Sequence, residues 1–372
     1  MPVRIVHISD CYLPRLGGIE VQVDGLARAQ MALGHEVHII TSTAWRGPGS
    51  LSDHELGLHV HRLHASIPLD LPLHPRAIKV IKAQLKSIKP DVVHVHVGAV
   101  SQFAWGGIIA AHQLHLPVLS TVHSIWGPIA RRLYGVARNL LNWHNWTALS
   151  AVSQAAAAAV RTASQSRVLV TGNGVDLAGW STVDSRTGRR IHLVCATRFS
   201  PRKRIEALLE ISRTLHRELG DSAPRFTIAG SGSRLDFARA FVTRNNLVDV
   251  VALPGRVQRS QLRDLYSSAD AFIQVSVRES FGLAAIEARA AGLPVIGRSG
   301  NGFAEFVEDG VTGFLEPNDK HVMRRIKQLV ADPALLENLR QNSRNTPPTQ
   351  NWEYAVRAAE HGYHAAMTQR LR

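Results

Sequence analysis

The sequence predicts an α/β protein made of two Rossmann-like domains, each built on a parallel sheet. Short apolar runs alternate with helix-like stretches along both halves of the chain, which is typical of βαβ units. A polar, turn-rich segment at residues 176–190 interrupts this alternation. The 372 residues leave room for two domains of roughly 100–200 residues each. We therefore expect a first domain at 1–175, a linker at 176–190 and a second domain at 191–351.

Most of the expected strands are short, uncharged and rich in β-branched residues, as parallel strands covered on both faces are. They lie at 4–9, 36–42, 58–63, 92–96, 118–122, 148–152 and 168–170 in the first domain, and at 191–197, 225–229, 250–253, 271–274 and 295–297 in the second. A helix at 20–33 is expected to end at Gly34, since glycine is common just after helices. An amphipathic helix at 352–372 ends the chain.

Composition and cysteine usage narrow the class of protein. Hydrophobic residues make up 45% and charged residues 19% of the chain, which excludes a disordered protein. Cys11 and Cys195 lie far apart, in or beside apolar runs, so we expect reduced thiols in a cytoplasmic protein. The first residues form a strand pattern rather than a signal peptide, and the longest apolar stretch is too interrupted to span a membrane.

The charge is strongly positive and unevenly distributed. The formal net charge is +14, and no acidic residue occurs between Val92 and Val175. Five arginines lie in that stretch: Arg131, Arg132, Arg138, Arg161 and Arg167. Such a field favours nucleotide phosphates, acidic lipid surfaces or nucleic acid as partners. No RNA-binding motif, zinc ribbon or basic strip with interleaved aromatic residues accompanies it, so the sequence argues against nucleic acid.

Two segments that follow expected strands carry residues suited to phosphate binding. Gly17 and Gly18 precede the first helix, where free backbone N–H groups can approach a phosphate; a plain strand-to-helix turn is the other interpretation. Arg198 and Lys203 lie five residues apart in a proline-containing loop after the strand at 191–197. Two fixed cations suit a departing diphosphate, although a solvated basic loop has the same composition.

The segment at 278–288 is the most informative. Glu279 falls in the loop after the strand at 271–274, and Glu287 lies eight residues later in the following helix. If Glu287 faces a ligand, its carboxylate can accept both hydroxyls of a ribose, and Glu279 can accept hydroxyls nearer the reacting carbon. Three residues between them, Ser280, Phe281 and Gly282, would present N–H groups at the helix start. The alternative is a helix with ordinary exposed acids.

Taken together, these segments resemble retaining glycosyltransferase family 4, which has the GT-B fold and includes bacterial phosphatidylinositol mannosyltransferases. The similar segments run over nearly the whole chain: PRLGGIE, DVVHVH, STVHS, AVS and NGVD in the first half, and RFSPRK, IAGSGS, PGRV, the E-x7-E segment, GLPVIG, DGVTGFLEP and Trp352 in the second. Each is loose alone, but their order and spacing are specific. The GT-B fold implies two Rossmann-like domains facing across a cleft, with the final helix crossing back onto the first domain.

The resemblance implies roles for individual residues. Gly17 and Gly18 would contact the donor phosphate or the acceptor, and Arg198 and Lys203 would hold the diphosphate. Glu279 would contact the donor sugar, Glu287 the ribose, and the backbone at Arg256 and Val257 the base. The donor-binding set also includes Ser280, Phe281, Gly282 and Leu283. His123, at the end of the strand at 118–122, would lie beside the sugar, so that the catalytic set is His123, Glu279, Arg198 and Lys203. An isolated histidine of this kind is otherwise more often structural.

The sequence departs from the family at one point and offers no metal site that we expect to be used. The family often has glycine after the loop lysine, where this chain has Arg204. No Asp-x-Asp motif occurs, and the His59/His61 and His94/His96 pairs have no third ligand nearby in sequence, so zinc is not expected. Fixed cations can replace a metal at the diphosphate. We expect no cofactor beyond the nucleotide sugar.

The donor and acceptor are less well defined by the sequence. GDP-mannose is the first choice, by likeness to the phosphatidylinositol mannosyltransferases. A UDP-sugar enzyme acting on a soluble acceptor is the alternative. A nucleotide-sugar epimerase of the same architecture is a further one, which the E-x7-E segment argues against.

A basic helix expected at 76–89 suggests a membrane contact. Its cationic residues are Arg76, Lys79, Lys82, Lys86 and Lys89, and Ile78, Ile81, Leu85 and Ile88 form an apolar stripe about 100° away. Such a helix can lie on an anionic leaflet at the inner face of the membrane. Alternatively, the stripe packs on the sheet and only the lysines meet solvent. The expected acceptor is therefore lipid-linked or membrane-proximal.

Overall fold

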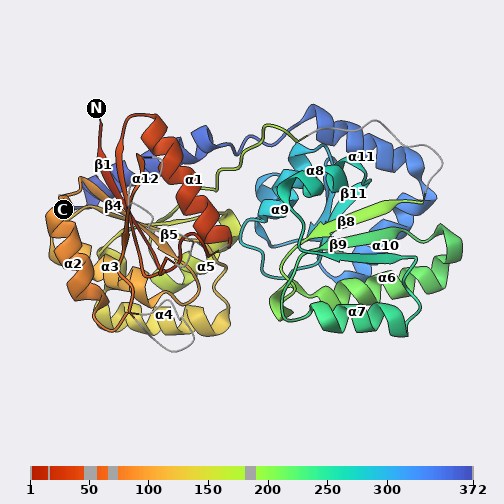
Figure 1. Cartoon of the computed structure of the whole chain (residues 1–372), viewed down its shortest axis with the longest axis horizontal. Helices are drawn as coiled ribbons and strands as arrows, with labels where there is room; N and C mark the ends of the chain where they lie inside the picture. The colour runs from red at the N-terminus through yellow and green to blue at the C-terminus, as the bar shows by residue number, and fades with distance from the viewer. Residues whose placement is uncertain (1, 16, 46–56, 66–73, 181–189, 371–372) are drawn as a thin grey trace. The chain divides into compact units, whose positions relative to one another are not determined.

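The computed structural model describes residues 2–15, 17–45, 57–65, 74–180 and 190–370. The chain forms two compact units: unit 1 comprises Met1–Asp176 and Gln350–Arg372, and unit 2 comprises Leu177–Thr349 (Figure 1). Most of the expected linker, residues 181–189, lies outside the described residues, as does Leu16 of the first glycine-containing segment.

Unit 1 contains a seven-stranded parallel sheet in the order β3-β2-β1-β4-β5-β6-β7. Its strands are β1 (Arg4–Ser9), β2 (Glu36–Thr41), β3 (His59–Arg62), β4 (Val92–Val97), β5 (Val118–Val122), β6 (Ala148–Ala151) and β7 (Val168–Val170). Every neighbouring pair is parallel, so the carboxyl ends of all seven strands lie at one edge. That edge is where ligands bind in open α/β sheets.

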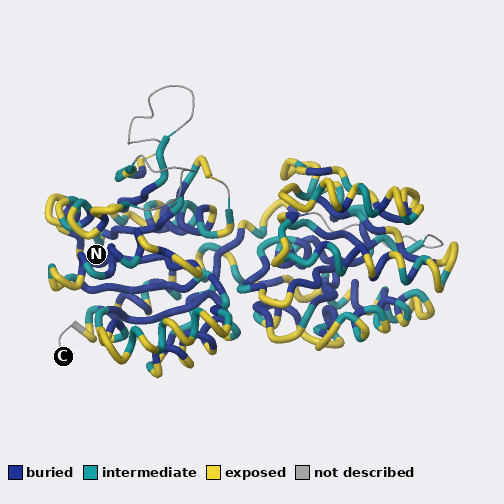
Figure 2. The backbone as a smooth tube through the Cα atoms, turned by 90° about the horizontal axis from the view of Figure 1, so that it is seen from below, coloured by how far each residue is buried: buried dark blue, intermediate teal, exposed yellow. Residues whose placement is uncertain are grey.

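Helices cover both faces of this sheet, which explains why most residues of its central strands are buried. They are α1 (Gly18–Ala32), α2 (Ala77–Ile88), α3 (Gln102–Gln113), α4 (Pro128–Leu141), α5 (Gln154–Ser164) and α12 (Trp352–Arg370). Along β1, Ile5 packs with α1 and α12, whereas Val6 and Ile8 pack with α2, α3 and α5. Figure 2 shows the strands buried within each unit and the exposed sides on the helices.

The last helix, α12, belongs to unit 1, as the sequence predicted. Its side chains Val356, Ala359 and Tyr363 pack in the same core cluster as Ile5 and Leu119 of the sheet. At the start of the helix, the Trp352 ring lies where a side chain on Gly25 would be, because an added Cβ there would be 2.1 Å from the ring. The glycine therefore allows the close approach of α12 to α1.

Unit 2 contains a six-stranded parallel sheet in the order β10-β9-β8-β11-β12-β13. Its strands are β8 (His192–Ala196), β9 (Arg225–Ala229), β10 (Val251–Gly255), β11 (Ala271–Gln274), β12 (Val295–Arg298) and β13 (Gly313–Glu316). Its helices are α6 (Ile205–Leu219), α7 (Leu235–Arg244), α8 (Arg259–Ser267), α9 (Leu283–Ala290), α10 (Asp319–Ala331) and α11 (Pro333–Asn345). The two units thus share one architecture, as expected.

Strand β13 is the element that the sequence pattern did not predict. It is four residues long, begins with a glycine and contains no β-branched residue. Gly313 is required by its neighbour: a Cβ there would lie 2.1 Å from the carbonyl oxygen of Val295, and its φ is +159°. Close pairing with β12, rather than local propensity, fixes this strand.

Within the described part of the chain, no helix is long and apolar enough to cross a membrane.

Candidate functional site

The first part of the candidate site lies at the carboxyl edge of the unit 2 sheet. Strands β8 and β11 are neighbours, so the loops that follow them meet. Lys203 ends the short 3₁₀ helix at Pro201–Lys203 after β8, and its Nζ donates a hydrogen bond to Oε2 of Glu279, in the loop after β11. The structure therefore brings together two residues predicted independently for the diphosphate and the sugar.

Glu279 is held in one orientation by groups that the sequence analysis missed. The Nε2 of Gln274 donates to the same carboxylate oxygen at 2.8 Å, and the backbone N–H of Glu279 donates to Oδ1 of Asn301 at 3.0 Å. Asn301 in turn donates from Nδ2 to the carbonyl of Ser276 at 2.7 Å. The carboxylate is buried, and these contacts fix its direction. The only sequence signal was an amide side chain at the end of a buried strand.

Helix α9 begins directly after this loop and offers unused backbone donors. Among the described residues, none accepts a hydrogen bond from the N–H groups of Ser280, Phe281 or Gly282. Gly282 caps the helix with φ at +95°, and an added Cβ would lie 2.4 Å from the Phe303 ring. The Phe281 side chain is buried, so only its backbone can face a ligand. The helix dipole adds to the attraction of these donors for an anion.

The other predicted donor residues of unit 2 share this sheet edge. Arg198 is exposed in the loop after β8, and Arg256 is exposed after β10, two strands away in the sheet. Val257 is half-buried beside Arg256, and Leu283 is half-buried in the first turn of α9. Glu287 lies half-buried in the second turn of α9. Burial, and after it the charge of Glu287, hold the pKa of Tyr266 well above its usual value.

Arg204, the departure from the family pattern, occupies a backbone conformation that favours glycine. Its φ and ψ are +54° and +44°, the left-handed region. The guanidinium donates to both carboxylate oxygens of Asp319, at 3.0 and 2.6 Å, and to the carbonyl of Val275 at 3.1 Å. Arg298 donates to the same Asp319 at 2.6 Å. The added positive charge of Arg204 is therefore paired with the Asp319 carboxylate, which also binds Arg298.

In unit 1, the glycines at the start of α1 lie at the carboxyl end of β1. Gly17 is extended, with φ at −166°, and Gly18 is the first residue of the helix. A Cβ on Gly17 would lie 2.4 Å from Oε2 of Glu20, whose carboxylate is buried against the helix start. Gly17 thus makes room for an acidic side chain of the same turn. Phosphate binding by these two glycines stays a prediction.

His123 follows β5 at the same edge of the unit 1 sheet and ends a chain of hydrogen-bonded histidines. Its Nε2 lies 2.9 Å from Nδ1 of His96, and Nε2 of His96 lies 2.9 Å from Nδ1 of His7. The other end of the chain is Oε1 of Gln30, 2.7 Å from Nε2 of His7. The Gln30 amide nitrogen donates to the Tyr363 hydroxyl at 2.8 Å.

This series of hydrogen bonds determines which ring nitrogen of each histidine carries the proton. Because Gln30 presents its oxygen to His7, Nε2 of His7 must donate, and its Nδ1 must accept from His96. The same logic makes His96 accept from Nε2 of His123, which leaves Nδ1 of His123 as an acceptor. Burial lowers the pKa of both His7 and His123 to about 4 and that of His96 well below its usual value, which agrees with three neutral rings.

The structure also supplies the third histidine that the sequence analysis did not find beside His94 and His96. A ligand nitrogen from each of His7, His94 and His96 lies within 4.8 Å of the others. Each of the six nitrogens already has a partner, since Nδ1 of His94 lies 3.0 Å from the Tyr363 hydroxyl and Nε2 lies 2.7 Å from Oγ1 of Thr121. The cluster is therefore satisfied by hydrogen bonds, and a bound ion would have to break several of them.

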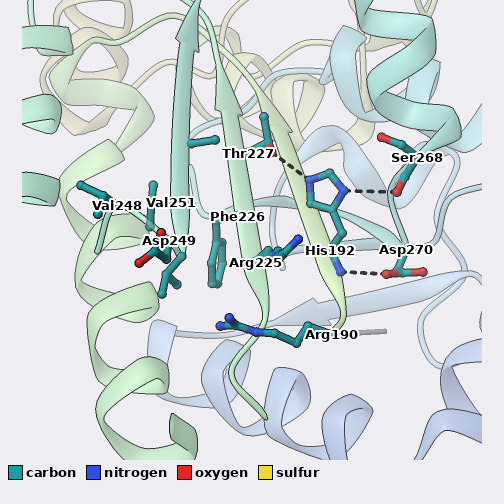
Figure 3. A pocket seen from close by; sticks show the side chains of 12 residues that line it. Arg190, His192, Arg225, Phe226, Thr227, Val248, Asp249, Val251, Ser268 and Asp270 are labelled. Carbon is teal, nitrogen blue, oxygen red and sulfur yellow. Dashed lines mark hydrogen bonds between the residues drawn. The ribbon is translucent and has the colours of Figure 1, made fainter. Parts of the chain in front are cut away.

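Unit 2 also contains a pocket of about 490 Å³ at the opposite edge of its sheet, by the amino ends of β8, β9 and β10 (Figure 3). His192 dominates its polar lining: Nε2 accepts from Oγ1 of Thr227 at 2.8 Å, and Nδ1 donates to the Ser268 carbonyl at 3.2 Å. The backbone N–H of His192 donates to Asp270 at 2.7 Å. These groups satisfy one another, and the predicted site residues lie elsewhere.

Comparison with known proteins gives two family matches that together span most of the chain. Residues 16–178 match the model described as Glycosyltransferase Family 4, and residues 184–346 match the model described as Glycosyl transferases group 1. The two boundaries follow the two units of the structure.

Similar proteins extend these matches over the full length. D-inositol 3-phosphate glycosyltransferase of Arthrobacter sp. (strain FB24) is 25% identical, over 95% of this chain and 91% of the relative. GDP-mannose:cellobiosyl-diphosphopolyprenol alpha-mannosyltransferase of Komagataeibacter xylinus is 27% identical, over 84% and 80%. Among solved structures, Anabaena HepE in complex with UDP-glucose has a TM-score of 0.73 at 20% identity, over 96% of this chain and 99% of that one.

Proposed function

Because this chain belongs to glycosyltransferase family 4 and has the GT-B fold, we propose that it moves a hexose, with retention of configuration, from a nucleotide diphosphate sugar to a lipid-linked or membrane-proximal acceptor. The observation that carries this proposal is the fixed Glu279 carboxylate, paired with Lys203 beside the unused N–H groups at the start of α9. One arrangement therefore offers an acceptor for sugar hydroxyls and donors for a diphosphate.

The diphosphate would be held by Lys203, Arg198 and the N–H groups of residues 280–282. Charge accumulates on the diphosphate as its bond to the sugar breaks, so fixed donors stabilise the transition state more than the ground state. Lys203 would exchange part of its contact with Glu279 for a phosphate oxygen. The carboxylate would then be free to accept hydroxyl hydrogen bonds from the sugar. No divalent cation is needed in this scheme.

The transfer itself would take place on one face of the sugar. The bond from the anomeric carbon to the diphosphate breaks, the acceptor oxygen bonds to the same face of that carbon, and the acceptor proton passes to the departing diphosphate. No protein nucleophile takes part. His123, with Nδ1 as an acceptor, would receive a hydrogen bond from a sugar hydroxyl. NMR analysis of the product tests retention, and an inverted anomeric centre would reject this route.

GDP-mannose is our first choice of donor, and a UDP-sugar is the second. The Komagataeibacter relative is named for GDP-mannose, whereas the solved Anabaena structure holds UDP-glucose. Glu287 would read only the ribose, so the base must be read by the backbone near Arg256. A thermal-shift panel of GDP, UDP, ADP and CDP tests this, because the nucleotide bound most tightly raises the melting temperature most. A preference for UDP would replace our first choice.

We propose a lipid-linked acceptor at the inner face of the cytoplasmic membrane. Support comes from the polyprenol-linked acceptor in the name of the Komagataeibacter relative and from the exposed basic residues of α2. The inositol phosphate named for the Arthrobacter relative keeps a soluble acceptor as the alternative. Nucleoside diphosphate release, measured with each acceptor class in turn, separates the two. Faster release with an inositol phosphate than with polyprenol-linked sugars would favour the alternative.

A further inference from the structure

Helix α4 exposes an apolar stripe that none of the described residues of unit 1 covers. Ile129 is 79% exposed, Leu133 66%, Val136 54% and Leu140 75%, and no residue of the helix is buried. These positions recur at steps of four, three and four, so they form one narrow face. Figure 1 shows α4 at the periphery of unit 1. Four large aliphatic side chains in one line are unusual on a water-exposed surface.

Another side of the helix is anchored to unit 1. Tyr134 stacks on Trp126 with ring centroids 4.0 Å apart, and its hydroxyl accepts a hydrogen bond from Nε1 of Trp105 at 3.0 Å. Nε1 of Trp143 donates to the Tyr134 carbonyl at the same distance. The aromatic cluster thus holds α4 in a fixed rotation, so the helix cannot turn its stripe inward.

The positive charge of this region indicates which kind of surface the stripe would contact. At 100° per residue, the exposed Arg132 lies about 70° around α4 from the stripe, whereas the half-buried Arg131 and Arg138 lie on the side opposite it. No acidic residue occurs between Val92 and Val175 to neutralise this charge. Two copies of the chain meeting through this helix would bring like charges together. An anionic bilayer accepts both features, since its headgroups pair with arginines and its acyl region takes the aliphatic side chains.

Helix α2, the basic helix noted in the sequence, does not offer the same combination. Ile81, Leu85 and Ile88 are buried in the core of unit 1, and only Ile78 is exposed. The interpretation that its apolar stripe packs on the sheet is therefore confirmed. Its lysines can approach a charged surface, but the helix has no apolar face left to insert.

We infer that α4 is the element that inserts into an anionic bilayer, with Ile129, Leu133, Val136 and Leu140 at the acyl boundary and Arg132 among the headgroups. This inference rests on the proposed lipid-linked acceptor. Pro128, the first residue of α4, follows His123 by only five positions, so insertion would place the membrane surface close to the sugar-binding end of the sheet. The helix would deliver the enzyme to its acceptor.

The test is co-sedimentation of the full chain with vesicles of phosphatidylglycerol and phosphatidylcholine. Leu133→Gln combined with Leu140→Gln leaves every charge unchanged. It should lower vesicle affinity by about tenfold or more, because two aliphatic side chains that would insert into the bilayer are lost. The matched control is Leu33→Gln combined with Val248→Gln, at positions 62% and 64% exposed outside α4, and it should bind like the wild type. Neutral vesicles should bind all variants weakly.

Equal vesicle binding by the α4 variant and the wild type would overturn the inference, as would no wild-type binding at low salt. A dimer that the α4 substitutions dissolve would also overturn it, in favour of a second copy as the partner. Nucleoside diphosphate release from the donor, without lipid, is measured in parallel. Absence of vesicle binding by the wild type, together with normal release, rejects the membrane inference alone, whereas no release from any donor by the wild type rejects the proposed function.

Discussion

At the scale of single residues, the candidate site depends on which groups hold each functional side chain. Glu279 is oriented by Gln274, Asn301 and Lys203. His123 is oriented by His96 and, through it, by His7 and Gln30. In both cases the candidate residue follows a strand. Gln274 ends the same strand that Glu279 follows, whereas the other supporting residues come from segments farther away in the sequence. Substitution of a supporting residue should therefore disturb function without removing a substrate contact.

The two glutamates of the E-x7-E segment should have separable effects. We expect Glu279→Gln to lower kcat mainly, because its contact would lie near the reacting carbon, and Glu287→Gln to raise KM for the donor mainly. Each lost carboxylate–hydroxyl contact is worth about 1.5–3 kcal/mol. Steady-state kinetics of donor turnover measures both. Full activity in both variants would remove these residues from the site, and Glu305→Gln, outside the segment, serves as the control.

The buried histidines should make folding stability fall on acidification. Their pKa values are lowered in the folded state, to about 4 for His7 and His123, so the unfolded chain binds protons first as pH falls below 6.5. Their contribution is complete above pH 6.5 and is lost progressively towards pH 4. The buried Asp10 has the opposite effect on stability, because burial raises its pKa to about 6 and the folded state therefore binds its proton first on acidification. A single carboxyl offsets only part of the stability lost through the histidines.

Urea unfolding between pH 7.5 and 4.5 measures this dependence. The control is a variant in which His7 and His96 are both replaced by Gln, since it should show a shallower loss of stability below pH 6.5 whatever its stability at pH 7.5. The same slope in both proteins would show that these histidines do not cause it.

At the scale of elements, Arg204 precedes α6 in a left-handed backbone conformation that favours glycine. Substitutions at this position measure what a non-glycine residue costs there. A non-glycine residue in the left-handed region costs about 1–2 kcal/mol. Arg204→Gly removes that cost and the ion pair together, whereas Arg204→Ala removes only the ion pair. We therefore expect the Ala variant to be less stable than the Gly variant by about 1 kcal/mol in urea unfolding. Equal stabilities would mean that the backbone conformation carries no strain. Arg298→Ala reports the effect of losing the other arginine on Asp319, together with its hydrogen bond to the Pro317 carbonyl.

Most strands and the class of fold could be predicted from the sequence, because most strands are short apolar runs that the sequence alone reveals. The apolar runs at 4–9, 118–122, 225–229 and 271–274 match the observed strands residue for residue. Strand β13 was not readable, since its pairing with β12 supplies what its own residues lack. The same limit applies to the site. Asn301, His7 and Gln30 contact residues that the order of strands brings close, and that order is not a local property of the sequence.

At the scale of the whole molecule, the chain joins two sheets of the same architecture, and each contributes residues at the carboxyl edge of its strands. Unit 2 presents cations and helix N–H groups, which suit the nucleotide end of a donor. Unit 1 presents neutral histidine and the exposed apolar stripe of α4, which suit the sugar and the proposed acceptor. Each unit therefore supplies a different half of the proposed reaction.

From this proposed division we expect catalysis to proceed without a divalent metal. The diphosphate would be neutralised by Lys203, Arg198 and the start of α9, and the histidine cluster in unit 1 is satisfied by hydrogen bonds. Turnover of the donor in excess chelator should therefore equal turnover in magnesium or manganese. Lys203→Ala should lower turnover at least about tenfold, since it removes a charged contact worth about 1.5–3 kcal/mol. Activity lost with chelator and restored by either ion would assign the diphosphate to a metal instead, and then Lys203 would serve mainly to position Glu279.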